Sequence, residues 1–187
     1  HLFTKEQPDF NWDNEEVHQY FLDTLRFWSD RGVDGFRIDV AHALKKNLEP
    51  LPDRDSYALS VMKDDGTDPI FDRDEVHEVY AAWREVFNEY DPPRVAVAEA
   101  WVHPNRRPPY ASANGLGQAF NFDLLASKWD ADSFRKIITD NLEMSAKTGS
   151  SSTWVMSNHD VIRHATRLAI PGYGESADGF GDEHRWY

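Results

Sequence analysis

The sequence predicts a parallel α/β fold in which strands alternate with single helices. Apolar residues recur at helical spacing in three stretches, and short apolar runs such as residues 95–98 lie between them. Such runs are typical of parallel strands buried on both faces, and strands joined by one helix run parallel because the crossover returns the chain to the same edge. An open doubly wound sheet and part of an eight-stranded barrel both fit. No glycine-rich phosphate loop follows any strand, and this argues against a doubly wound sheet that binds a nucleotide.

The first helix is predicted from a capping box, Asp13 with Glu16 three residues later, and Gly32 ends it. Its apolar stripe consists of Val17, Tyr20, Phe21, Leu25 and Trp28. A strand is predicted over residues 33–40. Residues 41–72 are polar and rich in proline and aspartate, and a loop of that length in a compact domain is usually functional.

The later elements follow the same alternation. A second helix begins near residues 72–74 and ends before Pro92, and a third covers residues 130–147. Strands are predicted at residues 94–101, 119–125 and 152–160. The apolar face of the second helix consists of Val76, Val79, Tyr80, Trp83, Val86 and Phe87, and that of the third of Phe134, Ile137, Ile138 and Leu142.

Composition limits the classes of partner. The chain has 187 residues, enough for one domain with a sizeable core. Its net charge of −13 argues against nucleic acid and against an anionic membrane surface as partners. The absence of cysteine excludes disulfides and thiolate metal sites. Because the chain opens on His1 and stops at Tyr187 without an obvious end, we expect it to be a piece of a longer protein.

Three predicted strands end in a carboxylate: Asp39, Glu99 and Asp160. The carboxyl ends of parallel strands meet at one face, so these side chains are expected to converge there. A single acid at a strand end is commonly a helix cap. Three such acids, with Arg37 near the first and His159 beside the last, make that explanation insufficient.

The neighbours of the first two carboxylates suggest a division of roles. Arg37 and Asp39 are two residues apart, so both side chains should leave the same face of a strand that otherwise looks buried. Burying charge is costly, and Arg37 would hold Asp39 anionic. Glu99 follows an apolar run, a setting that raises a carboxyl pKa and keeps the acid protonated. Glycoside cleavage uses one ionised and one protonated carboxyl, whereas a metal cluster would need several such ligands within one shell.

Four segments resemble one known family. "DGFRIDVAH", "VAVAEAW" and "SNHD" resemble three successive signature segments of the α-amylase family of retaining glycoside hydrolases. "QPDFNW", residues 7–12, resembles a further segment of its oligo-1,6-glucosidase and α-glucosidase branch. The resemblance implies a (β/α)8 TIM barrel in which this chain supplies about strands 4 to 7. Residues 1–187 would then be part of a single catalytic domain, with the N-terminal strands and a C-terminal domain outside them.

The resemblance also implies roles for individual residues. Asp39 matches the nucleophile, Glu99 the general acid/base, and Asp160 a third carboxylate that binds sugar hydroxyls and distorts the ring. The expected substrate-binding residues are Arg37, His159, Val40 and His42, of which Val40 resembles the residue of α-1,6-active members and His42 follows its strand closely enough to line the site.

The resulting expectation is an α-glucosidase that hydrolyses α-1,4 or α-1,6 bonds of short oligosaccharides with retention. A transglycosylating or isomerising relative, of the trehalose synthase or sucrose-active type, and a non-catalytic amylase-like subunit are the alternatives. The expected partner is a small oligosaccharide, not nucleic acid or membrane, and the expected location is cytoplasmic. No cofactor and no metal is expected, since a structural calcium of this branch would bind before residue 1. An incomplete barrel leaves two sheet edges unpaired, so the isolated chain is expected to be inactive.

Overall fold

The computed structural model describes residues 1–49 and 64–169 and contains one four-stranded sheet. The strands are β1 (Gly35–Ile38), β2 (Val95–Ala98), β3 (Gly117–Asn121) and β4 (Ser152–Trp154), in the order β1-β2-β3-β4. β1 pairs in parallel with β2, with Arg37 opposite Val97, and β2 pairs in parallel with β3, with Ala98 opposite Ala119. The predicted parallel α/β fold is confirmed.

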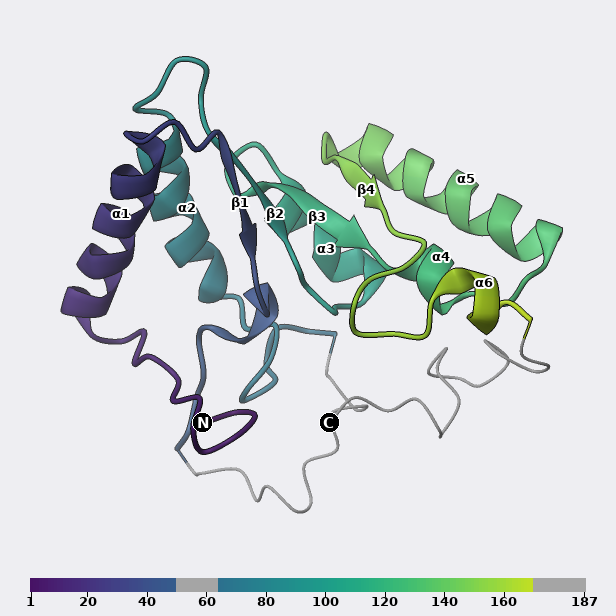
Figure 1. Ribbon diagram of the computed structural model, residues 1–187, viewed down its shortest axis with the longest axis horizontal. Helices are drawn as coiled ribbons and strands as arrows, with labels where there is room; N and C mark the ends of the chain where they lie inside the picture. Colours follow the sequence, from purple (N-terminus) through teal and green to yellow (C-terminus); the bar gives the residue numbers. More distant parts are fainter. Residues whose placement is uncertain (50–63, 170–187) are drawn as a thin grey trace. The chain divides into compact units, whose positions relative to one another are not determined.

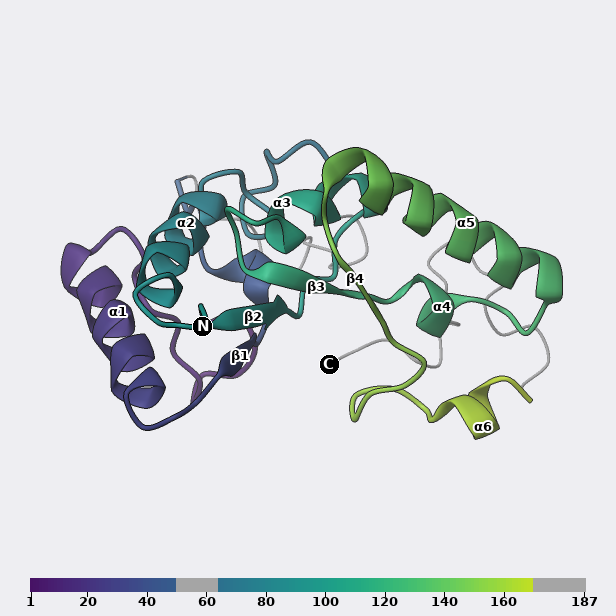
Figure 2. The same cartoon turned by 90° about the horizontal axis from the view of Figure 1, so that it is seen from above.

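The chain forms two compact units, the first comprising residues 1–119 and 149–151. In this unit α1 (Glu15–Ser29) and α2 (Val76–Phe87) lie side by side and cover the strands β1 and β2 (Figures 1 and 2). The short helices η1 (Ala41–Ala43), η2 (Pro104–Arg106) and α3 (Arg107–Ala111) follow β1 and β2. The helix start predicted at Asp13 is wrong by one residue: the side chain of Asn14 caps α1 by accepting the N–H of Glu16 at 2.9 Å.

The core of the first unit forms between α2 and the strands. Every residue of the predicted apolar face of α2 is buried, which confirms that prediction. The stripe of α1 is only partly buried, because Tyr20 and Trp28 are 61% and 49% exposed while Leu25 is buried. In the described part of this unit α1 packs mainly on α2, so only one side of its stripe is covered.

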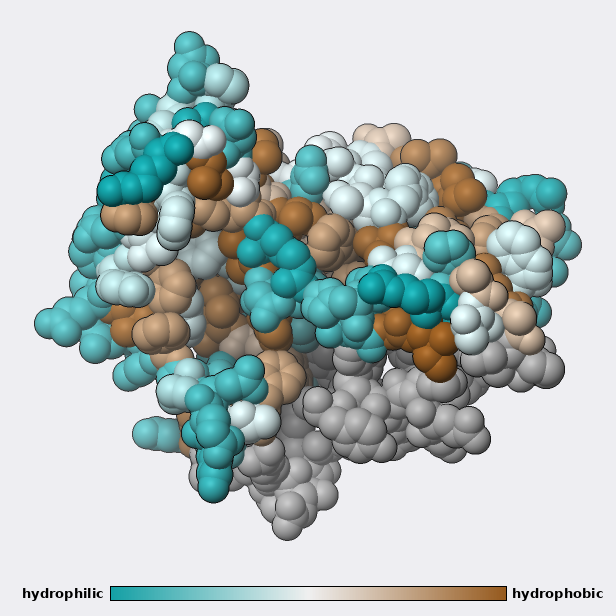
Figure 3. All heavy atoms as spheres, in the orientation of Figure 1, coloured by the Kyte–Doolittle hydropathy of each residue, from teal (hydrophilic) through white to brown (hydrophobic). Residues whose placement is uncertain are grey.

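The second unit holds the remaining described residues, with α4 (Asp123–Ala126), α5 (Ala131–Thr148), β4 and α6 (His164–Arg167). The strand predicted at 119–125 ends early, because the chain turns into α4 at Asp123. The expectation that α5 turns its apolar face inward is wrong for Ile138 and Leu142, which are exposed. Hydrophobic surface accordingly lies over α5 (Figure 3).

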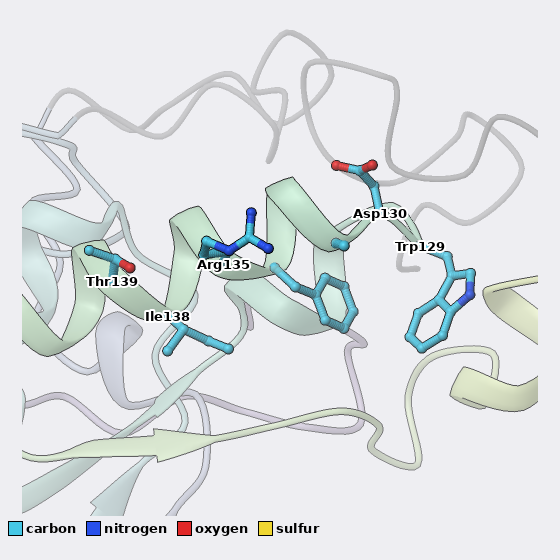
Figure 4. Close-up of a pocket in the computed structure, with 7 residues that line it drawn as sticks. Trp129, Asp130, Arg135, Ile138 and Thr139 are labelled. Atoms are coloured by element: carbon cyan, nitrogen blue, oxygen red, sulfur yellow. The ribbon is translucent and has the colours of Figure 1, made fainter.

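A hollow of about 610 Å³ lies along the beginning of α5 (Figure 4). Trp129 and Asp130 lie just before the helix, and Arg135, Ile138 and Thr139 lie on it. None of the residues predicted to be functional lines this hollow. Asp39 and Glu99 lie instead directly after the strands β1 and β2.

Candidate active site

Arg37 and Asp39 are joined by a hydrogen-bonded ion pair where β1 ends. Nη1 of Arg37 donates to Oδ1 of Asp39 at 2.6 Å, as expected for side chains on one face. The expectation that the pair is buried is wrong, because the side chains of Arg37 and Asp39 are 38% and 72% exposed. Asp39 lies just past the end of the strand, and β1 is the first strand of the sheet with a neighbour on one side only among the described strands. The carboxylate of Asp39 is thus accessible to a ligand.

Glu99 lies directly after β2 and is only 6% exposed. Its Oε2 accepts the backbone N–H of Val40 at 3.0 Å and lies 3.3 Å from Nη2 of Arg37. Its Oε1 accepts the indole N–H of Trp101 at 3.2 Å. The guanidinium of Arg37 therefore contacts an exposed carboxylate with one nitrogen and a buried carboxyl group with the other.

The pKa of Glu99 is raised above its ordinary value, chiefly because burial disfavours the charged carboxylate. The N–H groups of Val40 and Trp101 and the charge of Arg37 oppose this shift, while the negative charge of Asp39 adds to it. The direction agrees with the prediction made from the apolar run before Glu99. A buried carboxyl beside an exposed, arginine-paired carboxylate is the asymmetry that acid–base chemistry with two carboxyl groups requires.

The backbone at Val40 is held in an unusual conformation. Its φ of 45° and ψ of 44° lie in the left-handed region, where a β-branched residue is rare. Two backbone hydrogen bonds flank it: Glu99 donates its N–H to Ile38 and Ala41 donates its N–H to the carbonyl of Glu99, both at 2.9 Å. The hydroxyl of buried Tyr80 donates to the carbonyl of Ala41. These contacts fix the turn that aims the N–H of Val40 at Glu99.

His42 lies in the short helix η1, which directly follows this turn, and is buried. Its ring stacks on Phe71 with centroids 5.3 Å apart. Burial lowers the pKa of His42 to about 4, although a hydrogen bond with the backbone of Glu99 opposes the shift, so the ring is neutral at pH 7. This position supports the backbone of Glu99, and direct contact of His42 with a sugar stays a prediction.

In the second unit, His159 and Asp160 lie in the loop after β4. The strand ends at Trp154, so the expectation that it runs on to residue 160 is wrong. The side-chain oxygen of Asn158 accepts the N–H of Asp160 at 3.0 Å and turns the chain there. Nε2 of His159 lies 3.3 Å from Oδ1 of Asp160. The loop is braced by buried Arg167, which donates from Nη2 to the carbonyl of Met156 at 2.6 Å.

The structure brings together Arg37, Asp39 and Glu99 in the first unit and pairs His159 with Asp160 in the second. Convergence of all three carboxylates stays a prediction. Sequence reasoning missed Trp101, although in the strand predicted at residues 94–101 its position two residues after Glu99 would place both side chains on one face. It also missed the backbone N–H of Val40, for which the sequence carries no signal.

Among residues 1–49 and 64–169, no group of three or more histidine, aspartate or glutamate side chains is placed to hold a metal ion. No helix among the same residues has both the length and the apolar character needed to cross a membrane.

Comparisons with known proteins give one consistent family. A family model described as alpha amylase, catalytic domain, matches residues 1–176. The oligo-1,6-glucosidase of Parageobacillus thermoglucosidasius is 31% identical over 193 residues, covering 92% of this chain and 32% of that enzyme. The solved structure of the trehalose-6-phosphate hydrolase of Bacillus licheniformis matches with a TM-score of 0.72 and 26% identity, over 95% of this chain and 32% of its own. The solved structure of the alpha-glucosyl transfer enzyme XgtA matches with a TM-score of 0.71 and 27% identity, over 92% of this chain and 35% of its own.

The chain spans about a third of the length of these relatives. Its parallel strands accordingly form part of a barrel, which confirms the predicted fold class. The resemblance to the oligo-1,6-glucosidase branch is confirmed as well. The chain belongs to the α-amylase family, and its strands are a segment of the family's catalytic (β/α)8 barrel.

Proposed function

We propose that the complete barrel containing this chain hydrolyses α-glucosidic bonds of short oligosaccharides with retention of configuration. The observation that carries the proposal is the guanidinium of Arg37, which contacts exposed Asp39 and buried Glu99 at once. Retaining glycosidases need a nucleophilic carboxylate and a nearby protonated acid. The names of relatives, oligo-1,6-glucosidase and trehalose-6-phosphate hydrolase, support glycoside hydrolysis as the reaction class.

In the proposed first half-reaction, Asp39 attacks the anomeric carbon of the glucosyl unit. Oδ1 of Asp39 is occupied by Arg37, which leaves Oδ2 as the attacking oxygen. As the new C–O bond forms, the glycosidic C–O bond breaks and its electron pair stays on the leaving oxygen. That oxygen takes the proton of Glu99, whose raised pKa favours the acid form needed at this step.

In the second half-reaction, water attacks the anomeric carbon of the glucosyl ester. The Glu99 carboxylate takes a proton from that water, the ester C–O bond breaks, and Asp39 leaves as a carboxylate. Asp160, with His159 beside it, would bind sugar hydroxyls and favour the distorted ring of the transition state. A sugar hydroxyl in place of water gives transfer instead, the reaction named for the similar enzyme XgtA. A cytoplasmic location of the protein stays a prediction.

The test compares Asp39→Asn with the parent protein on maltose, isomaltose and p-nitrophenyl α-glucoside. The amide is isosteric but is a poor nucleophile, so the turnover number should fall by about 10⁴-fold or more, in the range that loss of a nucleophile costs. Proton NMR of the first product formed by the parent should show the α-anomer, because two inversions retain configuration.

Asp34→Asn is the matched control. Asp34 is also an exposed aspartate in an ion pair with an arginine, Arg94, at 3.0 Å, but it precedes β1. It should keep the parental turnover number. Equal losses in the two variants, or a β-anomer as first product, would reject the proposed nucleophile.

A further inference from the structure

The two oxygens of the Glu99 carboxyl group have unequal surroundings. Oε2 faces two donors, the N–H of Val40 at 3.0 Å and Nη2 of Arg37 at 3.3 Å. Oε1 faces a single hydrogen-bond donor among the described residues, the indole N–H of Trp101 at 3.2 Å. A carboxylate oxygen has two acceptor positions. Oε2 is therefore filled by donors, while Oε1 keeps one position open.

This inequality decides where a proton fits. A proton on Oε2 would point at the cation of Arg37 or the N–H of Val40, both of which only donate. A proton on Oε1 meets no such conflict, since Trp101 occupies the other acceptor position. We infer that Trp101 is a positioning residue for the acid/base group, its indole N–H orienting Glu99 so that Oε1 holds and exchanges the catalytic proton. This inference rests on the proposed function.

Most of the groups that act on Glu99 in the first unit come from β1 and the chain that follows it, whereas Trp101 follows Glu99 on its own segment. Arg37 and the N–H of Val40 favour the carboxylate, Asp39 disfavours it, and His42 contacts its backbone. Trp101 differs from Arg37 because its contact with Glu99 involves neither Asp39 nor the turn at Val40. Removing the indole N–H should therefore change the acid/base group and leave the nucleophile in place.

The indole acts in both half-reactions. As the proton leaves Oε1 for the glycosidic oxygen, negative charge develops on Oε1, and the N–H of Trp101 is already directed at it. A hydrogen bond to the ionised form strengthens as that charge forms. In the second half-reaction the same oxygen takes the proton of water. Trp101→Phe keeps most of the ring but removes the donor.

The test is the pH dependence of kcat/KM for Trp101→Phe in the complete protein. Without the donor the acid form of Glu99 is favoured further, so its pKa rises and the basic limb should move up by about half to one pH unit, the worth of one hydrogen bond.

A comparison of two substrates gives a second readout. On isomaltose, whose leaving oxygen needs a proton, the variant should lose about tenfold in kcat/KM. A 2,4-dinitrophenyl α-glucoside, which needs none, should stay near the parent. Trp28→Phe, an exposed tryptophan on α1, is the control and should change neither.

The outcomes separate the inference from the proposed function. If the parent cleaves neither substrate, the proposed function is overturned and this inference with it. If the parent cleaves both but Trp101→Phe keeps the parental basic limb and loses equally on both substrates, the inference alone is overturned.

A second measurement uses the parent labelled with ¹⁵N-tryptophan, so it does not depend on the folding of the Phe variant. One indole N–H resonance should move at the pH of the basic limb, and Glu99→Gln should abolish that movement. A parent in which no indole resonance moves there contradicts the inference.

Discussion

At the scale of single residues, the site is defined by the contacts of one arginine. Arg37 contacts Asp39 and Glu99 through different nitrogens. Both carboxyl groups follow a strand, but the side chain of Asp39 is exposed and that of Glu99 is buried. Exposure leaves the carboxylate of Asp39 accessible, and burial raises the pKa of Glu99. The same arginine thus contacts one exposed and one buried carboxyl group. An exposed ion pair such as Arg37–Asp39 contributes little to stability, which agrees with the catalytic role proposed for Asp39.

The left-handed backbone at Val40 gives a prediction at this scale. In this region alanine costs about 1–2 kcal/mol relative to glycine, since its Cβ crowds the carbonyl. Val40→Gly should therefore be more stable than Val40→Ala by about 1 kcal/mol, measured by urea unfolding. The ordinary order should hold at Ala81, an exposed residue of α2, where Ala81→Gly should lose about 1 kcal/mol. A Val40→Ala variant at least as stable as Val40→Gly would argue against a left-handed turn.

At the scale of elements, the short helix η1 contains a buried, neutral histidine, His42, which is hydrogen-bonded to the backbone of Glu99 at the end of β2. Burial lowers the pKa of His42 to about 4 from an ordinary 6.5. Between these values the unfolded chain holds a proton that the folded chain does not. The free energy of unfolding therefore falls as pH drops from about 6.5 to about 4, and this group adds no further loss below.

The prediction is that His42→Phe flattens the pH dependence of stability. Between pH 7 and pH 4 the parent should lose about 3 kcal/mol more of its free energy of unfolding than the variant does. Urea unfolding at several pH values measures it, with each protein referred to its own value at pH 7. Some slope should remain, because burial also lowers the pKa of His77. If the free energy of unfolding has the same pH dependence in parent and variant, His42 binds its proton equally well in the folded and the unfolded chain, which would contradict the prediction.

The elements also show how far sequence patterns reach. α2 was predictable because its six apolar positions recur at helical spacing and are all buried. The positions of Asp39 and Glu99 at the ends of β1 and β2 were predictable from the residue pattern, although the strands predicted at residues 33–40 and 94–101 run past the observed ends at Ile38 and Ala98. The end of β4 was not, since the hydrogen bonds of Asn158 turn the chain where the residue pattern still permits a strand. Trp101 and the N–H of Val40 belong to the site through three-dimensional contacts, and one of them is a backbone group that no residue type reveals.

At the scale of the whole molecule, the chain carries part of a barrel. Apolar side chains of α1 and α5 that the helical pattern assigned to the core are exposed, among them Trp28 and Leu142. A closed barrel pairs every strand on both sides, whereas a segment leaves edges. Unsatisfied edges and exposed apolar faces both lower the stability of a segment on its own.

The prediction at this scale is that residues 1–187 alone have no measurable α-glucosidase activity. The complete protein should turn over p-nitrophenyl α-glucoside under the same conditions, and the isolated chain should not, even at a hundredfold higher concentration. Intrinsic tryptophan fluorescence should also show a broad unfolding transition for the segment and a sharper one for the whole protein. Turnover by the isolated chain that Asp39→Asn abolishes would overturn this prediction.

The role proposed for Asp39 can be tested by trapping the covalent intermediate in the complete protein. A 5-fluoroglucosyl fluoride slows the second half-reaction, so a retaining enzyme accumulates the glycosyl ester and intact-mass spectrometry detects one added fluorosugar. We predict that peptide mapping places this sugar on Asp39 and that Asp39→Asn gains no mass. A sugar on another residue, or turnover of natural substrate by the Asp39→Asn variant at the parental rate, would show that Asp39 is not the nucleophile.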